Sequence, residues 1–336
     1  MSNNSSAISV KNLWQVFGPN PEKIVDSPDA ALPRAELREK TGNTAAVRDV
    51  SFDVAPGEVF VVMGLSGSGK STIGRLVVGL LKPTQGEIQM FGTDIHQDSA
   101  DALKKIRRKV QIVFQDPQGS LNPRMRIENA IAEPLDISGQ YSPNERADRV
   151  KELIELVGLP RDCGKRFSHE FSGGQRQRIG IARAIALNPA FIVCDEPVSA
   201  LDVSMQAQVV NLLLDLQEKL NLSYLFIAHD LAVVRHVSSR VAVMYAGRIV
   251  ELAPRLDLYS KPLHPYTRAL MDAVPLPRPG MQKAVGVPGE VPSLLNPPSG
   301  CAFHTRCPRA SQICTVDKPD YRQVSQKHFV ACHFID

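Results

Sequence analysis

The nine residues from Gly64 to Thr72 have types and spacing suited to binding phosphate. They read GLSGSGKST and fit the pattern G-x-x-x-x-G-K-[ST]. Glycines let backbone N–H groups surround phosphate oxygens, Lys70 supplies a charge to the β- and γ-phosphates, and the Ser71 hydroxyl can bind Mg²⁺. An apolar run precedes the segment and a helical pattern follows it, as the pattern requires; the alternative is a glycine-rich turn without a ligand. The predicted nucleotide contacts are Gly64, Ser66, Gly67, Ser68, Gly69, Lys70, Ser71 and Thr72.

A pair of carboxylates, Asp195 and Glu196, ends the apolar run FIVCDE. At the end of a buried strand, Asp195 can reach the ligands that surround Mg²⁺, and Glu196 can polarise an attacking water as a general base. Alone, the pattern fits equally well a strand followed by a solvated acidic turn. Together with a phosphate-binding loop it favours nucleotide hydrolysis.

A second anion-binding device is predicted at residues 171–178, FSGGQRQR, just before a helical stretch. Ser172, Gly173 and Gly174 offer a hydroxyl and backbone N–H groups at a helix N-terminus. The alternative is an ordinary helix start, because serine is a good N-cap. One phosphate-binding loop does not need a second cradle, whereas two chains placed head to tail would use it, each completing the other's nucleotide site.

The composition excludes several classes of protein. The chain has 336 residues, which favours two structural units over one, and its 43% hydrophobic and 22% charged residues are ordinary for a globular protein. The net charge of +4 is too small to indicate nucleic-acid binding. No apolar run reaches the roughly 18 residues of a transmembrane helix, and no signal peptide is visible at the N-terminus. The chain is therefore expected in the cytoplasm.

Strands alternate with helices along most of the chain, which predicts a largely parallel sheet. A helix with one apolar face is expected around 150–157 and another at 203–219. The last strand is expected to form a hairpin that turns at Ala246–Gly247. Residues 18–44 are polar and look like an insertion. The strands are predicted at 8–17, 58–64, 109–115, 191–195, 224–229 and 241–251.

The composition changes after residue 253. Ten of the 25 prolines lie between 254 and 298. Because proline removes a backbone donor, this part is expected to be an extended, turn-rich appendage without regular helix or central strand.

The motifs together resemble the nucleotide-binding subunits of ABC transporters. Gln115 at a strand end, SGGQ at 172–175, the DE pair, SALD at 199–202 and His229 after YLFIA follow the phosphate-binding loop in that order. The resemblance covers about residues 8–250. It implies an α/β P-loop NTPase fold with a RecA-like core, a helical subdomain at about 116–178 and an antiparallel β subdomain. It also implies that the chain binds and hydrolyses ATP with Mg²⁺.

The resemblance assigns roles within the site. ATP bound to the opposite subunit would be contacted by Ser172, Gly173, Gly174 and Gln175. Gln115 would sense Mg²⁺ and water and face the membrane partner, while Glu196 is the general base. His229 would stabilise the γ-phosphate, although a lone histidine after a strand is more often structural. Asp202 would signal across the dimer, and the ligands near Mg²⁺ would be Ser71, Gln115 and, from just outside the ligand shell, Asp195.

One aromatic residue near the N-terminus would stack on adenine. Phe17 in VKNLWQVFG aligns with that position, Trp14 is its rival, and either side chain could instead belong to the core.

Different segments of the chain resemble the ATPases of two different groups of importers. The segment LREKTGNTAAVRDVSFDVAPGEVFVVMGLSGSGKST resembles ATPases of glycine betaine/proline importers. FQDPQGSLNPRMRI, KPLHPYTRALMDAVPLP and PGEVPSLLNPPSGCAFHTRCP resemble those of oligopeptide, dipeptide and nickel importers. The later segments favour a peptide importer, with an ATPase domain at 8–253 and a proline-rich, cysteine-containing extension at 254–336. Glycine betaine/proline or nickel import, and a non-transport ABC ATPase, remain alternatives.

The importer resemblance implies several partners. A second ATPase subunit is expected, in a heterodimer with a homodimer left open, together with two transmembrane permeases. An extracytoplasmic binding protein would act indirectly, and no nucleic acid is expected. The chain would sit peripherally at the cytoplasmic face of the cell (inner) membrane.

Four of the six cysteines gather near the end of the chain, at Cys301, Cys307, Cys314 and Cys332. No C-x₂₋₄-C pair typical of zinc occurs among them, whereas thiolates on irregular loops suit a [4Fe–4S] cluster. The family resemblance also implies a cluster-binding extension. Zinc, disulfides and free thiols are the alternatives, with His304 and His333 as further possible ligands. A metal-sensing or redox regulator that carries an ATPase is a third functional hypothesis.

Overall fold

The computed structural model describes residues 6–32, 34–96, 99–273 and 299–335, which divide into two compact units. Unit 1 comprises the N-terminal residues up to Ile8 together with Val54–Val59 and Met90–Ile227. Unit 2 comprises Ser9–Asp53, Phe60–Gln89 and Ala228–Asp336. Each unit is described by itself.

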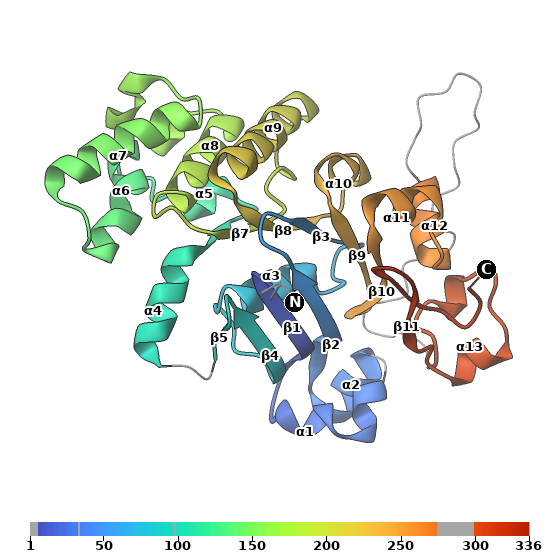
Figure 1. Ribbon diagram of the computed structural model, residues 1–336. Coiled ribbons are helices and arrows are strands. Elements are labelled where there is room, and N and C mark those ends of the chain that lie inside the picture. The colour runs from blue at the N-terminus through green and yellow to red at the C-terminus, as the bar shows by residue number, and fades with distance from the viewer. Residues whose placement is uncertain (1–5, 33, 97–98, 274–298, 336) are drawn as a thin grey trace, which may run out of the picture. The chain divides into compact units, whose positions relative to one another are not determined.

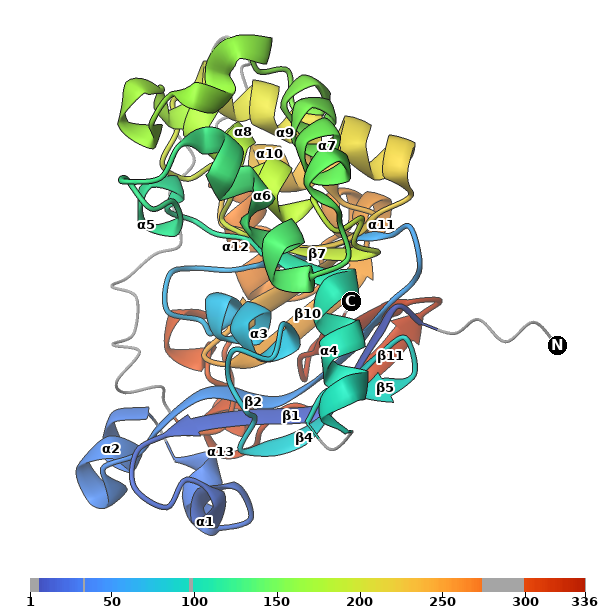
Figure 2. The same cartoon turned by 90° about the vertical axis from the view of Figure 1, so that its left-hand side faces the viewer.

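Unit 1 is built on three parallel strands, β6 (Val110–Val113), β7 (Phe191–Asp195) and β8 (Ser223–Ala228). Every residue of β7 and β8 is buried, as expected for strands that are covered on both faces. Figure 2 shows α6, α7 and α8 grouped above β7. The other elements of this unit are β5 (Thr93–Asp94), α4 (Ala100–Lys109), α5 (Pro117–Ser120), α6 (Ile127–Ser138), α7 (Pro143–Leu156), η2 (Arg161–Lys165), η3 (Ser168–Glu170), α8 (Gly173–Ala184) and α9 (Val203–Leu220).

Unit 2 contains a mixed sheet in the order β11-β12-β10-β9-β3. β3 (Val59–Met63) runs parallel to β9 (Arg240–Tyr245), and the other neighbours are antiparallel. The predicted hairpin is confirmed, because Tyr245 pairs with Arg248 and the two residues between them have positive φ angles of 50° and 83°. The remaining elements here are α3 (Lys70–Val77), α10 (Leu231–Val237), β10 (Arg248–Pro254), η4 (His304–Arg306), α13 (Gln312–Val316), β11 (Tyr321–Ser325) and β12 (His328–Ala331).

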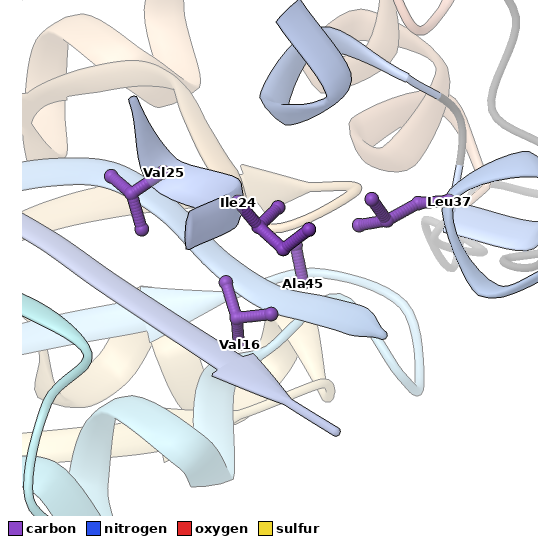
Figure 3. Packing of buried hydrophobic residues seen from close by; sticks show 5 residues of the cluster. All are labelled: Val16, Ile24, Val25, Leu37 and Ala45. Carbon is purple, nitrogen blue, oxygen red and sulfur yellow. The ribbon is translucent and has the colours of Figure 1, made fainter. Parts of the chain in front are cut away.

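The segment predicted as a polar insertion folds onto a small core of its own. It contains α1 (Glu22–Val25), η1 (Pro28–Ala31) and α2 (Arg34–Thr41), and lies between β1 (Ile8–Phe17) and β2 (Thr44–Val54), which form a second sheet in the order β2-β1-β4 with β4 (Gln85–Met90). Figure 3 shows the apolar side chains that gather there. Trp14 and Leu32 pack against them. The core consists of Val16, Ile24, Val25, Leu37 and Ala45.

The expectation of an appendage without regular helix is wrong for the part after residue 254. Two helices, α11 (Arg255–Ser260) and α12 (Pro265–Asp272), lie there, and Figure 1 shows α11 beside β10. Proline does not oppose them, because Pro254 precedes the first helix and Pro265 opens the second, where no backbone N–H is needed. The proline-rich stretch 274–298 lies outside the described residues.

The helices of the described ranges do not include one that is both long enough and apolar enough to cross a membrane.

Candidate functional site

The phosphate-binding loop lies in unit 2 between β3 and α3. Lys70 is buried, and its Nζ donates hydrogen bonds to the carbonyls of Gly64 at 2.8 Å and Leu65 at 3.0 Å. Ser66 and Gly67 are exposed at the tip, while Ser68 is buried and its carbonyl accepts from the Gly247 N–H. The lysine ammonium thus closes the loop on itself, in a place from which it can reach a phosphate.

Gly64 and Gly69 make this loop possible. Their φ angles are 152° and 106°, which residues with a Cβ rarely adopt. A Cβ on Gly64 would lie 2.3 Å from the Met244 carbonyl, and one on Gly69 would lie 2.3 Å from that of Ala46. Because no side chain caps α3 at Gly69, the first amides of the helix, next to Ser71 and Thr72, suit an anion.

The two aromatic candidates for adenine differ in their surroundings. Trp14 packs against the core of the insertion, and the Arg248 guanidinium lies 5.7 Å from its ring centre. Phe17 is 42% exposed at the end of β1. Trp14 is therefore already used in packing, and Phe17 remains the predicted adenine contact.

The acidic pair lies at the C-terminal end of β7 in unit 1. Asp195 is buried at the end of the strand, and Glu196 adopts a positive φ of 47°. The Gln115 side-chain amide donates to the Glu196 carboxylate at 3.0 Å and approaches the Ser199 hydroxyl at 3.4 Å. The structure therefore brings together Gln115, Glu196 and Ser199, and the proposed base has an amide that fixes one of its oxygens.

The signature residues Ser172 to Gln175 start α8. The Ser172 hydroxyl accepts from the Gln175 N–H at 3.3 Å, and the Gln175 side chain accepts from the Ser172 N–H at 3.0 Å. This reciprocal capping box is the helix-start alternative raised by the sequence. Gly173 is exposed and Gly174 is buried against Met205. The exposed serine remains on the surface, where a second chain could reach it.

Asp202 lies at the start of α9, and His229 directly follows β8. Asp202 caps α9, accepting from the Met205 N–H and the Ser204 hydroxyl, both at 2.9 Å, and these bonds hold the pKa of its carboxyl below the ordinary value. His229 is exposed just after β8, in unit 2. Their predicted roles stay predictions.

The four C-terminal cysteines line one pocket in unit 2, together with His264, His304 and His333. The Cys301 N–H donates to the Cys314 carbonyl at 2.9 Å, which joins two of the cysteine-bearing loops. The two histidines predicted as reserve ligands contact backbone carbonyls instead, His304 that of Cys301 and His333 that of Asp317. All six cysteines of the chain are described, and none is in a disulfide.

Burial raises the pKa of Cys301 to about 11, with the other three thiols adding to the shift, and it also raises the pKa of Cys307 and Cys332. Such thiols stay protonated unless a cation joins them. Within the described part of the chain, no three His, Cys, Asp or Glu side chains are arranged as a metal site. The donor set is assembled, but the observed side chains do not form a ligand shell.

Two residues that sequence reasoning missed stand out in unit 2. Tyr266 accepts a hydrogen bond from the Leu65 N–H at 3.0 Å, and Glu251 is fully buried. The only sequence signals were an acidic residue inside an apolar strand and an aromatic residue after His264–Pro265.

Comparisons with known proteins identify the family of the chain. Residues 47–199 match a family model described as ABC transporter, and residues 250–314 match one described as the C-terminal region of oligopeptide/dipeptide transporters. A putative peptide import ATP-binding protein of Brucella abortus (strain 2308) is 61% identical, over 86% of both chains. The oligopeptide transport ATP-binding protein AppF of Bacillus subtilis (strain 168) is 51% identical, over 88% of this chain and 92% of that protein.

Solved structures show the same fold. A dimeric ATP-binding cassette in a post-hydrolysis state, bound to ADP and Pi, matches with a TM-score of 0.61 and 28% identity, over 74% of this chain and 98% of that chain. A CbiO1 subunit from Clostridium perfringens matches in fold with a TM-score of 0.63 and 23% identity, over 76% and 92% of the two chains.

Proposed function

Because the chain belongs to the ATP-binding subunits of ABC transporters and carries the oligopeptide/dipeptide C-terminal region, we propose that it powers the import of di- and oligopeptides. The observation that supports a peptide cargo is the match of residues 250–314 to the C-terminal region of oligopeptide/dipeptide transporters. The motifs of the ATPase part are shared by importers of other solutes. The family resemblance, the fold class and the ATPase activity predicted from the sequence are confirmed.

The hydrolytic roles follow the local geometry. Lys70 leaves the Gly64 and Leu65 carbonyls for the β- and γ-phosphates, and Ser71 and Asp195 serve the magnesium that accompanies ATP. Glu196 orients the attacking water, and the Gln115 amide fixes the carboxylate by donating to its Oε2. His229 neutralises charge on the γ-phosphate.

A head-to-tail pair of ATPase subunits completes the site. Support for this comes from Ser172 and Asp202, which are both exposed at helix starts with their backbone partners fixed. The partner is a second ATPase subunit of the same kind, in a heterodimer or a homodimer. Closure of the pair on ATP drives the permeases between their two states.

A groove in unit 1 suits a permease segment. It has a volume of about 460 Å³ and lies among α4, β6, α6 and α8, with apolar walls that include Phe114 and Ile137 and a basic rim of Lys104, Arg107 and Arg108. Phe114 directly precedes Gln115 and is 40% exposed. A short apolar segment with acidic ends fits this groove by charge, and it would hold the chain at the cytoplasmic face of the membrane.

The test is ATPase activity in the reconstituted complex with two permeases and the binding protein. Peptide-loaded binding protein should stimulate hydrolysis, whereas Phe114→Ala should lose the stimulation and keep the basal rate. Leu256→Ala, at a residue that is 74% exposed in unit 2, is the control. Stimulation by glycine betaine or nickel instead of peptide would show that the transported solute is not a peptide. Co-purification with ribosomes or DNA would exclude transport.

The four cysteines carry a separate proposal, a [4Fe–4S] cluster with zinc as the alternative. It is supported by the shared pocket of Cys301, Cys307, Cys314 and Cys332. Burial raises the pKa of Cys301, Cys307 and Cys332, so these thiols need a cation nearby to ionise. The observed side chains must turn to ligate, since they do not yet form a ligand shell. A cluster would cross-link the cysteine-bearing loops and so stabilise the C-terminal segment.

Anaerobic purification tests this directly. The protein should be brown, with an absorbance shoulder near roughly 400 nm and with iron and sulfide in equal amounts. Cys307→Ser should lose the colour, and Cys163→Ser, at a buried cysteine outside the pocket, should keep it. Colourless protein with one zinc per chain would decide for the alternative.

A further inference from the structure

One peptide unit of the phosphate-binding loop is held from both sides. The carbonyl of Gly64 accepts from Lys70 Nζ at 2.8 Å, and the N–H of the same peptide, which belongs to Leu65, donates to the Tyr266 hydroxyl at 3.0 Å. When Lys70 turns to a phosphate, its bond to this carbonyl is lost. Tyr266 is then the remaining side chain among these contacts that fixes the plane of the peptide.

Tyr266 is itself held rigidly. It is fully buried, and its ring packs on Tyr245 with ring centres 4.7 Å apart and on Phe303 at 5.4 Å. Its own N–H donates to Nδ1 of His264 at 3.0 Å. Two aromatic neighbours and a cap bond leave the hydroxyl little freedom to move, because χ angles in packed cores occupy single rotamers.

A buried carboxylate connects this tyrosine with the end of the chain. Glu251 on β10 accepts from the N–H groups of Leu263 and His264, both at 2.9 Å, and lies 2.9 Å from Nε2 of His328 on β12. Glu251 also pairs with Val330 in the β10–β12 ladder. The contacts therefore run from β12 through Glu251 and His264 to Tyr266 and the loop.

We infer that Tyr266 is a positioning residue of the nucleotide site: it fixes the Gly64–Leu65 peptide, and through Glu251 the C-terminal strand β12 sets the affinity for ATP. The Tyr266 hydroxyl bonds the backbone N–H of Leu65. It acts on the backbone whose amides surround the phosphates, so its loss weakens binding of the nucleotide more than it slows the chemical step.

The test compares two tyrosines of the full-length chain. Tyr266→Phe keeps the ring and removes the acceptor of the Leu65 N–H, and we expect the KM for ATP and the Kd for ADP to rise about three- to tenfold with kcat changed less than twofold. Tyr259→Phe is the matched control, because the Tyr259 hydroxyl on α11 donates to the Leu231 carbonyl on α10 at 3.0 Å, a residue outside the loop. Unchanged KM and Kd in Tyr266→Phe, even with a lower melting temperature, would mean that the hydroxyl only stabilises the fold.

A double-mutant cycle tests the connection to β12. His328→Asn should raise the Kd for ADP in the wild-type background, and it should add little in the Tyr266→Phe background, because both act on the same peptide. Full additivity of the two effects, or no effect of His328→Asn on nucleotide affinity, would overturn the role of the C-terminal strand.

Discussion

Glu196 occupies a left-handed backbone conformation at the point where β7 ends, and its N–H donates to the Ile227 carbonyl at 3.0 Å. Positive φ angles are uncommon for residues other than glycine and often mark functional positions. The backbone turn aims the side chain at Gln115, which bonds one carboxylate oxygen. This bond fixes the orientation of the carboxylate that we propose as the general base.

Substitution of this one residue separates binding from hydrolysis. Glu196→Gln keeps the shape and an acceptor for Gln115, so we expect ATP to bind, the paired subunits to stay closed and hydrolysis to fall by at least about a hundredfold. Single-turnover hydrolysis and size-exclusion chromatography with ATP measure both effects. Glu218→Gln, at an exposed position of α9, should behave as wild type. A normal rate in Glu196→Gln would show that another group is the base.

A Cβ in the phosphate-binding loop provides a second residue-scale prediction. In Gly69→Ala the new methyl would clash with the Ala46 backbone carbonyl, which cannot turn aside as a flexible side chain can. We expect nucleotide binding to be lost, as measured by equilibrium titration, together with a lower melting temperature. Gly92→Ala is the control, since its positive φ of 79° carries similar backbone strain but its Cβ would meet no atom within 4 Å. Wild-type affinity in Gly69→Ala would contradict the geometry of the loop.

At the scale of elements, the insertion between β1 and β2 is a packed unit and not a loose loop. Leu37 on α2 is fully buried, and Arg48 donates to the Leu32 carbonyl at 2.9 Å. A polar segment with few apolar residues can still fold when those residues meet on one surface. The insertion thereby gives Trp14 a structural partner and leaves Phe17 at the surface.

Leu37→Ala should loosen the insertion. Removing a fully buried leucine side chain costs about 2–5 kcal/mol of local stability, so hydrogen exchange of residues 16–45 should speed up. Because the core of the insertion contains none of the predicted catalytic residues, kcat should stay within twofold. Glu36→Ala, at an exposed neighbour, should leave exchange unchanged. A fall in kcat of more than twofold, together with faster hydrogen exchange, would indicate that the insertion takes part in the site.

Local patterns predicted the elements that local physics determines. β1 and β7 match their predicted bounds, and the Ala246–Gly247 turn is where the hairpin signal indicated. The helices after Pro254 were missed, because proline was weighed as a breaker and not as a first helical residue. Tyr266 could not be found at all, since its contact with Leu65 joins residues 201 positions apart.

At the scale of the whole molecule, the predicted nucleotide residues are divided between the two units. The phosphate-binding loop, Phe17 and His229 belong to unit 2, whereas Gln115, Glu196 and the signature serine belong to unit 1. The predicted boundary at residue 253 stays a prediction.

Acid should destabilise the molecule through His264. Burial lowers the pKa of its imidazole to about 4, although the neighbouring Glu251 carboxylate acts to raise it. The Tyr266 N–H donates to Nδ1, and the ring otherwise faces Tyr266 and Phe303. The unfolded chain binds a proton near pH 6.5 and the folded chain does not, so stability is lost as pH falls from about 6.5 to about 4.

Between pH 7 and pH 5 the expected loss is about 2 kcal/mol, measured as the shift of the denaturation midpoint. Glu251 adds a further loss below its ordinary pKa of 4.5: burial raises its pKa, but hydrogen bonds from His328, Thr267 and two backbone amides leave it lowered. His264→Asn retains a good N-cap acceptor without a titrating group and should flatten the pH 7 to 5 interval. An equally steep fall in that variant would assign the dependence to other groups.

The pairing of Glu251 with His328 also constrains how the protein is made. The two residues are 77 positions apart, so the ribosome has released the strand that carries the carboxylate seconds before the imidazole exists, at about 5–20 residues per second. During that interval β10 has an open edge and a charge that lacks one of its partners. The sheet around the phosphate-binding loop is therefore completed only after residue 328 has been translated, and messages cut short before codon 328 should yield nascent chains that require chaperones.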